Sequence, residues 1–198
     1  MKKYVSVNKI KTDIIYNEMY KMSSLNLSRA NISKISQIKG LNKSIKSLNL
    51  DLSFNEITEI EDLEKLSNLI SLRLNYNRIT KIKGLENLNN LISLYLANNQ
   101  ITEIEGLENL TNLKMLNLND NQITEIKGLE NLTNLVSLEL YNNQITEIKG
   151  LGSLNKLKFL RIGENNISKE LIQELGGLDI KGYANNPQKF IAYYKEEE

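Results

Sequence analysis

The amino-acid sequence predicts an α/β solenoid, in which units of one strand and one irregular segment stack into a single curved ribbon. The first observation is a period of 22 residues: LISLYLANNQITEIEGLENLTN, starting at Leu91, recurs as LKMLNLNDNQITEIKGLENLTN from Leu113 and as LVSLELYNNQITEIKGLGSLNK from Leu135. The second is that apolar residues in each unit first alternate and then recur at every third position. A fixed period of this length indicates stacked repeats and outweighs local propensity.

The two spacings assign a structure to each part of the unit. Leu94 and Leu96 lie two residues apart, which is the spacing of a strand with one face turned inward. The next apolar positions fit 3₁₀ turns, in which side chains three residues apart eclipse. They are Ile101, Ile104, Leu107 and Leu110. No single unit can bury these side chains, so we expect successive strands to pair in parallel and to share one core.

Residues 1–21 do not fit the repeat and are predicted to form an N-terminal cap over the open edge of the first unit. A separate functional arm is the alternative. Tyr4, Val5 and Val7 predict a short strand. The apolar positions that follow predict a helical stripe instead. They are Ile10, Ile14, Ile15 and Tyr20.

About seven repeats follow, between residues 22 and 178. In the first of them Ala30 stands where the later units carry an Asn. The Asn of the second unit, Asn55, comes 25 rather than 22 residues after Ala30, because three extra residues are inserted. We expect this insertion to form a loop within residues 42–46.

The C-terminal end departs from the repeat again. In the seventh unit Glu170 stands where an Ile is expected, and Ser168 has the character of a helix N-cap. Residues 179–198 are predicted to form a C-terminal cap, in which Asn186 precedes a final helix that begins at Pro187. This cap would cover the last open edge of the solenoid.

Two polar positions recur with the period and have structural explanations. A repeated Asn carries both donors and an acceptor, which can satisfy backbone groups where the chain leaves the sheet. A repeated Gly is predicted to relieve a tight turn, since no phosphate-binding glycine motif is present. The asparagines are Asn55, Asn77, Asn99, Asn121, Asn143 and Asn165, and the glycines are Gly84, Gly106, Gly128 and Gly150.

The unit L-x-x-L-x-L-x-x-N-x-I resembles the leucine-rich repeat family over about residues 22–178. This resemblance implies a right-handed superhelix with a parallel β-sheet on its concave face. It also implies 3₁₀ or irregular segments on the convex face, a helical C-terminal cap and an Asn ladder. The 22-residue form is similar to the repeats of protein phosphatase 1 regulatory subunits and of internalin-type bacterial adhesins.

Composition excludes several classes of function. The chain has 25 Lys and Arg against 24 Asp and Glu, so a basic surface for nucleic acid or an acidic membrane is not expected. It has no Cys and no His, which removes zinc sites, thiol nucleophiles and His-based triads. We therefore expect no catalytic residue, no metal and no cofactor. Paired carboxylates such as Asp51 and Glu139 lie four repeats apart, too far for a glycosidase.

The variable positions of the strands are the candidate binding residues. The residue between the two inward Leu of each strand faces the concave surface, as do the residues just before and after. These positions vary freely and hold aromatic and Arg side chains, which are enriched at binding hot spots. The candidates are Asp51, Phe54, Arg73, Tyr76, Tyr95, Met115, Asn117, Glu139, Tyr141, Phe159 and Arg161. Convex positions interleave both charges and predict a solvated face.

The sequence therefore predicts a non-enzymatic scaffold that binds another protein on its concave sheet and is a monomer when unbound. An adaptor of the phosphatase-regulatory type is the first form of this hypothesis. Polar residues interrupt the apolar core that a signal peptide would need near the N-terminus, so we expect a cytoplasmic protein. The alternative is a secreted or surface adhesin or effector, similar to internalins, that binds a host protein.

Overall fold

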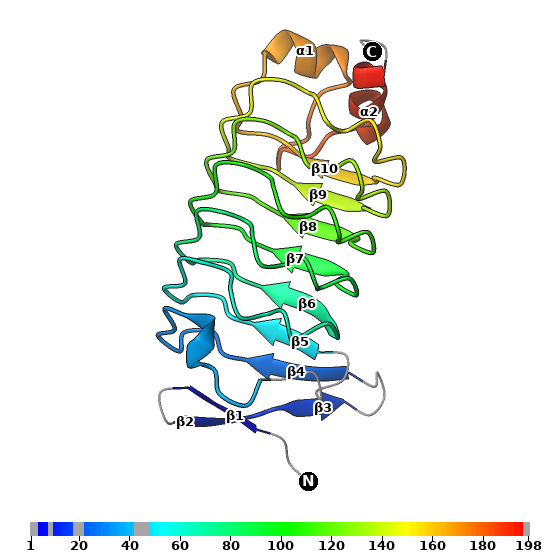
Figure 1. Cartoon of the computed structure of the whole chain (residues 1–198). Helices are drawn as coiled ribbons and strands as arrows, with labels where there is room; N and C mark the ends of the chain where they lie inside the picture. The colour runs from blue at the N-terminus through cyan, green and yellow to red at the C-terminus, as the bar shows by residue number, and fades with distance from the viewer. Residues whose placement is uncertain (1–3, 8–9, 18–21, 42–47, 196–198) are drawn as a thin grey trace.

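The computed structural model describes residues 4–7, 10–17, 22–41 and 48–195. They form a solenoid that rises from the N-terminus to the C-terminus, with one strand per turn (Figure 1). Successive turns add parallel strands to one sheet in the order of the sequence. The parallel strands are β4 (Met22–Asn26), β5 (Leu48–Asp51), β6 (Leu69–Arg73), β7 (Ser93–Tyr95), β8 (Met115–Asn117), β9 (Ser137–Glu139) and β10 (Phe159–Arg161).

The strand register keeps equivalent residues of neighbouring repeats side by side. Leu72 of β6 lies beside Leu94 of β7, which lies beside Leu116 of β8. All three are buried, and so are the Leu and Ile residues of the turns opposite them. The core is thus one continuous column of aliphatic side chains, as the stacking argument predicted.

The convex segments are turns rather than continuous helices. In the unit that begins at Leu69, the Leu88 N–H donates to the Leu85 carbonyl, and the Leu91 N–H donates to the Leu88 carbonyl. These are 3₁₀-type hydrogen bonds, which fits the spacing of three. Within the described residues, only η1 (Ile35–Gln37) is long enough to count as a 3₁₀ helix.

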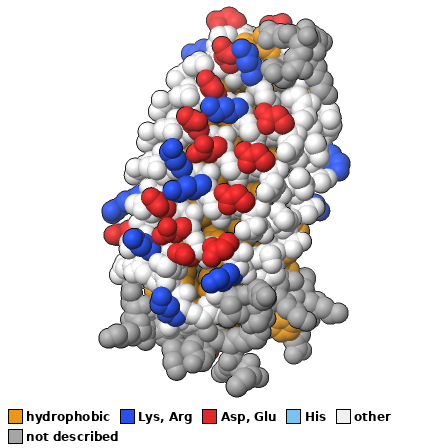
Figure 2. Space-filling model, in the orientation of Figure 1, with side chains coloured by type: hydrophobic (Ala, Val, Ile, Leu, Met, Phe, Trp, Pro, Cys, Tyr) orange, Lys and Arg blue, Asp and Glu red, His pale blue; other side chains and the backbone are white. Residues whose placement is uncertain are grey.

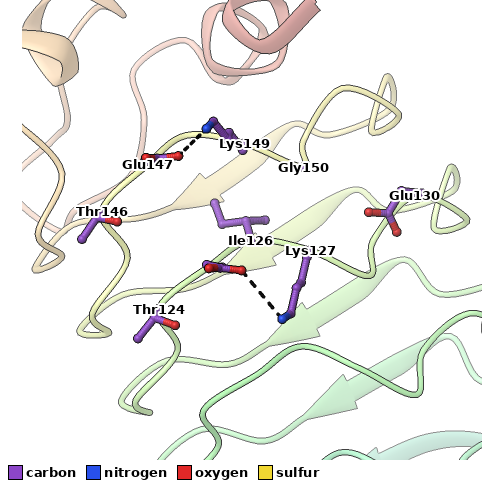
Figure 3. A pocket seen from close by; sticks show the side chains of 9 residues that line it. Thr124, Ile126, Lys127, Glu130, Thr146, Glu147, Lys149 and Gly150 are labelled. Atoms are coloured by element: carbon purple, nitrogen blue, oxygen red, sulfur yellow. Dashed lines mark ion pairs between the residues drawn. The ribbon is translucent and has the colours of Figure 1, made fainter. Parts of the chain in front are cut away.

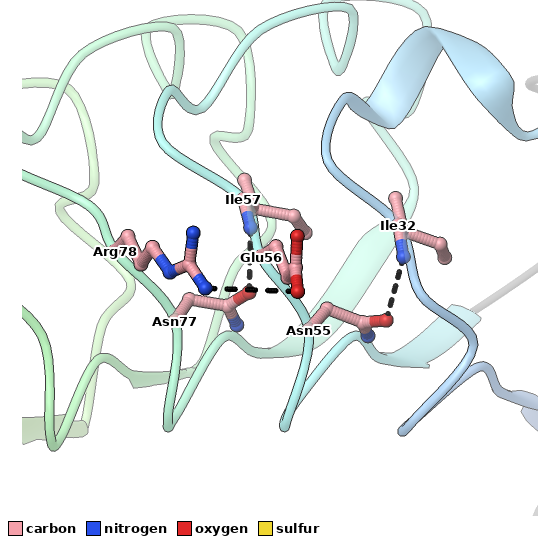
Figure 4. A network of polar contacts seen from close by, with 6 residues as sticks. All are labelled: Ile32, Asn55, Glu56, Ile57, Asn77 and Arg78. Atoms are coloured by element: carbon pink, nitrogen blue, oxygen red, sulfur yellow. Dashed lines mark hydrogen bonds and ion pairs between the residues drawn. The ribbon is translucent and has the colours of Figure 1, made fainter.

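The repeated Asn joins each repeat to the one before it, which confirms the predicted ladder. Asn77 accepts a hydrogen bond from the Ile57 N–H at 3.0 Å through Oδ1. Its Nδ2 donates to the carbonyls of Leu74 in its own repeat and Leu52 in the preceding one, both at 3.0 Å. Figure 4 shows this contact beside the equivalent one from Asn55. Each buried amide therefore satisfies backbone groups of two repeats at once.

The repeated Gly is required by contact between repeats as well as by backbone conformation. Gly106 has a φ of +68°, and a Cβ there would lie 2.4 Å from the carbonyl oxygen of Ile82 in the preceding repeat. The sequence predicted a tight turn here, and the turn is tight because adjacent repeats touch through their backbones. A side chain would push the repeats apart.

A second set of asparagines, which the sequence analysis passed over, links the outer turns. Asn112 Nδ2 donates to the carbonyl of Asn89 at 2.9 Å, and Asn134 Nδ2 donates to that of Thr111 at 2.9 Å. Each bond joins one repeat to the repeat before it. Part of the unusual Asn content therefore has a structural cause.

The N-terminal residues add strands rather than the predicted helical stripe. β1 (Tyr4–Val7) and β2 (Ile10–Asp13) form an antiparallel hairpin, and β3 (Ile15–Asn17) pairs antiparallel with β4. The prediction of a strand at the start was right, but the helical interpretation of Ile10, Ile14 and Ile15 was wrong; Tyr20, the last residue of the predicted stripe, lies outside the described residues. The open edge of β4 selects extended chain in β3, because its backbone groups need hydrogen-bond partners. The insertion expected within residues 42–46 lies outside the described residues.

The C-terminal end closes with two helices and a short extended segment. α1 (Lys169–Glu174) begins after Ser168, whose Oγ accepts the Leu171 N–H at 3.1 Å, as predicted. α2 (Pro187–Lys195) starts at the predicted Pro and buries Phe190 against the core. Between them, Gly182 accepts the N–H groups of Ile162 and Gly163 next to β10. No helix in the described part of the chain is long and apolar enough to cross a membrane.

Candidate protein-binding surface

The predicted binding residues lie in three rows on the outward side of the sheet and the turn that follows it, which we call the concave surface. Strand register puts the residues of each row in consecutive repeats next to one another. The first row contains Met115 and Phe159, the second contains Asp51, Arg73, Tyr95, Asn117, Glu139 and Arg161, and the turn row contains Phe54 and Tyr76. Tyr141 lies between the second row and the turn.

Exposed apolar side chains gather on this surface. The described residues include seven large hydrophobic side chains that are exposed: Ile15, Tyr16, Phe54, Tyr76, Met115, Phe159 and Ile180. Four of them are predicted binding residues. Phe54 and Tyr76 are 44% and 48% exposed, although the next residue in each case, Asn55 or Asn77, is buried. Exposed aromatic side chains on a rigid sheet are typical of protein-binding surfaces.

The turn row has an unusual backbone. The residue before each repeated Asn has a φ of 54–57°, which is the left-handed region that Asn, Asp and Gly tolerate best. Asn98, Asp120 and Asn142 suit this conformation. Phe54 and Tyr76 do not, and bulky side chains there carry a strain of about 1–3 kcal/mol each. The fold does not need aromatic residues at these two positions, since three other repeats use Asn or Asp.

Phe54 and Tyr76 form an ordered stack at the N-terminal end of the concave surface. Their ring centroids are 4.3 Å apart and the planes differ by 8°. The Arg29 guanidinium lies over the Phe54 ring at 4.9 Å from the centroid. Neighbouring rungs of the solenoid hold these three side chains at fixed spacing, so a partner would meet a preformed apolar and cationic surface.

The middle of the concave surface is a smaller cluster. The Arg73 guanidinium lies over the Tyr95 ring at 4.8 Å. The Tyr95 hydroxyl and the Ser93 hydroxyl both donate toward the Met115 sulfur, at 3.8 and 3.6 Å. Met115 is 41% exposed. Because Met adapts its shape to its surroundings, this cluster adds an adjustable apolar contact next to the rigid stack.

The C-terminal end of the concave surface is polar and tied to the cap. Asn117 Nδ2 and Asn119 Nδ2 donate to the Glu139 carboxylate at 3.1 and 2.6 Å. Arg161 Nε donates to the Lys181 carbonyl at 2.7 Å, and its guanidinium lies over the Tyr141 ring at 4.0 Å. These predicted residues are therefore brought together and already engaged within the chain.

Tyr183 completes this cluster and was missed by the sequence analysis. The Arg161 guanidinium lies 5.5 Å from its ring centroid. Burial raises the pKa of the Tyr183 hydroxyl above its usual value, and Glu139 adds to the effect while Arg161 opposes it. Tyr183 lies outside the repeats, so no column of equivalent residues could reveal it. Arg29 and Asn119 were in the columns, but only the geometry shows their contacts.

A shallow hollow adjoins this cluster at the end of the sheet, between β9, β10 and the cap. Its volume is about 410 Å³. It is lined by Lys158 and Phe159 of the last repeat and by Asp179, Lys181 and Tyr183 of the cap. Phe159, at 56%, is more exposed than Met115 in the same row. The cap thus extends the concave surface beyond the repeats.

Charged residues of the convex segments pair with one another. Lys127 lies 3.3 Å from Glu103 and 3.7 Å from Glu125, and Lys149 lies 2.6 Å from Glu147. Figure 2 shows acidic and basic side chains interleaved along the visible face of the solenoid. A hollow of about 430 Å³ lies among them, and Figure 3 shows that its lysines point toward carboxylates. Both lysines of this hollow are therefore paired with carboxylates.

The fold and its repeat are those of leucine-rich repeat proteins. Models of this family, described as Leucine Rich repeats (2 copies), match residues 48–87, 67–109, 89–131 and 133–177. The chain belongs to the leucine-rich repeat family. No curated protein matches the sequence.

Several solved structures are similar to the chain. The internalin InlF of Listeria monocytogenes is 36% identical, with a TM-score of 0.66, over 79% of this chain and 45% of that one. The internalin C2 of the same organism is 30% identical, with a TM-score of 0.56, over 74% of this chain and 73% of that one. The TLR13 chain in a TLR13–ssRNA13 complex is 29% identical, with a TM-score of 0.61, over 78% and 23%. The chain thus spans less than half of the InlF structure.

Proposed function

We propose that this protein is a non-enzymatic binding module that holds another protein against its concave surface. The observation that carries the proposal is the stacked pair of Phe54 and Tyr76. Both are exposed, both occupy a strained backbone position, and the fold is built without aromatic residues in the equivalent turns of other repeats. Strain that the fold does not require is typical of functional sites.

The physical basis of binding is preorganisation. Side chains on the concave surface are held by paired strands and by stacking, so little conformational freedom is lost when a partner docks. Phe54, Tyr76, Met115 and Phe159 supply exposed apolar contacts along the surface. Arg73 and Arg161 supply charge. We propose that the free protein is a monomer, which light scattering would check.

A protein partner fits this surface better than nucleic acid does. The chain has a net charge of +1, and the basic residues of the concave surface alternate with Asp51, Asp120 and Glu139 rather than forming a stripe. Nucleic-acid binding draws most of its affinity from phosphate contacts with clustered Lys and Arg. The TLR13 complex contains ssRNA13, so the case against nucleic acid here depends on this charge pattern and not on the fold.

We propose two alternative cellular locations for such a module. A cytoplasmic adaptor of the phosphatase-regulatory type is one proposal, based on the repeat length. A secreted or surface protein that binds a host protein is the other, and the 36% identity to InlF favours it. Cell fractionation distinguishes them: recovery from the medium or the surface would reject the cytoplasmic proposal.

Affinity capture from the native cell, with mass spectrometry of the bound proteins, tests the proposed function. The informative variant is Phe54→Asn with Tyr76→Asn, because Asn already occupies this turn position in other repeats. The loss of stacking, about 0.5–1.5 kcal/mol, is offset by relief of backbone strain. We therefore expect the variant to unfold at about the wild-type temperature and to lose the captured partner.

The matched control neutralises an ion pair on the convex face: Glu103→Gln with Lys127→Gln. Both double variants keep the net charge of the wild type. The aromatic variant removes the stack of Phe54 on Tyr76, and the convex variant removes the ion pair of Glu103 with Lys127. The convex variant is expected to capture the partner as the wild type does. Capture that survives the aromatic substitutions but fails with the convex variant would reject the concave surface as the binding site.

A further inference from the structure

We propose that the C-terminal end of the concave surface is a docking site for a side-chain carboxylate of the partner protein, anchored by Arg161. We call the residues around it the carboxylate site: Lys158, Phe159, Arg161, Lys181 and Tyr183. The inference rests on the proposed function and deepens it, because it names the chemistry that this end of the surface recognises. Four observations lead to it.

The Arg161 guanidinium is held in place by neutral groups. Its Nε donates to the Lys181 carbonyl at 2.7 Å, and its planar group lies over the rings of Tyr141 and Tyr183 at 4.0 and 5.5 Å. Arg has five N–H donors, and within the described residues only the one on Nε is used. The remaining donors form the planar fork that binds a carboxylate through two oxygens. Because the side chain is already fixed, binding would lose little entropy.

The carboxylate on the neighbouring strand forms no ion pair with Arg161 among the described residues. Glu139 is its direct partner in the strand register, and opposite charges at such positions normally pair. Here the Glu139 carboxylate instead accepts from Asn117 at 3.1 Å and from Asn119 at 2.6 Å. No ion pair joins Glu139 to Arg161 in the part of the chain that the structure describes. The Glu139 carboxylate is thus engaged by two asparagines, and the guanidinium keeps donors for an external anion.

Two lysines add positive charge to the hollow that Tyr183 shares with Arg161. Lys158 and Lys181 both line this hollow of about 410 Å³, and Asp179 is the acid in its lining. Asp179 Oδ1 accepts the backbone N–H groups of Lys181 and Tyr183 at 2.8 and 2.9 Å. Neither lysine forms an ion pair with a described residue. In the convex hollow, by contrast, Lys127 and Lys149 both do.

The apolar residues of the hollow indicate which kind of side chain lies next to the carboxylate in the partner protein. Phe159 precedes Arg161 by two residues on the same face of β10 and is 56% exposed. Tyr183, which is half-buried, lines the same hollow. An apolar or aromatic side chain adjacent to the acid could pack on Phe159 while the carboxylate meets Arg161. The occupant is therefore an extended protein segment in which Asp or Glu lies next to an apolar residue.

The test uses the full chain and a small probe, so it needs no identified partner. The probe is acetyl-Phe-Glu-amide, with acetyl-Phe-Gln-amide as the uncharged control; both ends are capped, so the side chain alone carries charge. Binding is followed by ¹⁵N NMR through the Arg161 Nε–H, which is hydrogen-bonded and is one of four Arg signals. We expect saturable shifts at the carboxylate site with the Glu probe, and binding about tenfold weaker with the Gln probe.

Variants separate recognition from a structural role for Arg161 in holding the cap. Glu139→Gln keeps the acceptor for both asparagines but removes the neighbouring negative charge, so the Glu probe should bind about two- to fivefold more tightly. Lys181→Gln should weaken binding of the Glu probe alone, whereas Phe159→Ser should weaken both probes. A residue that only pins the cap would produce none of these changes.

Equal binding of the two probes, or shifts that rise linearly without saturation, would overturn the carboxylate site. Failure of Glu139→Gln to tighten the Glu probe would also count against it. These outcomes are independent of the proposed function, which depends on capture of a protein partner and on Phe54 and Tyr76 at the other end of the surface. A carboxylate site without partner capture, or the reverse, would therefore be recognised as such.

Discussion

Asn99→Ala should be among the most destabilising single substitutions in the solenoid. Asn99 Oδ1 accepts the Ile79 N–H at 3.0 Å, and Nδ2 donates to the carbonyls of Leu74 and Leu96 at 3.0 and 2.9 Å. Alanine leaves the buried Ile79 N–H without a partner. The carbonyls of Leu74 and Leu96 each lose one of two hydrogen bonds, because Asn77 and Asn121 still donate to them. An unsatisfied buried group costs about 1–3 kcal/mol and a lost hydrogen bond about 0.5–1.5 kcal/mol, so we expect a loss of about 2–6 kcal/mol. The free energy of unfolding of a native protein is only about 5–15 kcal/mol in total.

Urea denaturation followed by circular dichroism measures this loss, since the chain has no Trp to report by fluorescence. Gln100→Ala is the matched control, because Gln100 is the next residue, is exposed and shows only backbone hydrogen bonds. The control should change the free energy of unfolding by no more than about 0.5 kcal/mol. A loss of less than about 1 kcal/mol for Asn99→Ala would refute the role given to the ladder.

Asn99→Asp should make the stability of the solenoid depend on pH. The substituted carboxylate keeps the acceptor for the Ile79 N–H but turns a negative oxygen toward the carbonyls of Leu74 and Leu96. The folded state therefore disfavours ionisation and would raise the pKa of the new carboxyl. A raised folded-state pKa means that stability is retained at low pH and lost as the pH rises through it. The deficit relative to the wild type should thus be smaller at acidic pH than at neutral pH.

Two further substitutions test contacts between neighbouring repeats and with the cap. Gly106→Ala should cost at least about 2 kcal/mol, because a Cβ there would lie 2.4 Å from the Ile82 carbonyl oxygen. Gly176→Ala should cost less in the same denaturation series: its φ is +103°, but a Cβ there would make only ordinary contacts, at 3.8 Å or more. Tyr141→Ala should lower the thermal midpoint more than Tyr95→Ala does, because the Tyr141 ring packs on Gly182 of the cap. Equal midpoints for the two tyrosine variants would contradict that packing.

The repeat unit could be predicted because stacking leaves few choices. Every strand must turn the same residues inward, and every turn must satisfy the same backbone groups, so Leu94 and Asn99 reveal their roles by recurring. The period of 22 residues was therefore enough to predict the sheet, the core and the ladder. The same logic located the exposed rows, since the positions that vary are those that no neighbour constrains.

The ends and the side-chain contacts could not be predicted in this way. Ile10, Ile14 and Ile15 fit a helical spacing, yet Ile15 pairs with the open edge of β4 and Ile10 pairs with β1. A local pattern cannot show either pairing. Tyr183 reaches Arg161 from outside the repeats. Glu139 is charged in the sequence, but only the structure shows that its carboxylate accepts from two asparagines and forms no ion pair with Arg161 among the described residues. Such details decide which exposed residues are free to bind.

The affinity of the purified partner for three forms of the protein tests the central claim most directly. Titration calorimetry would compare the wild type, Phe54→Asn with Tyr76→Asn, and the convex control Glu103→Gln with Lys127→Gln. If the concave surface binds the partner, the aromatic variant should raise Kd by at least about thirtyfold, since two hot-spot side chains contribute about 1 kcal/mol or more each. The convex control should leave Kd unchanged. An unchanged Kd for the aromatic variant, together with a weaker convex variant, would contradict binding on the concave surface.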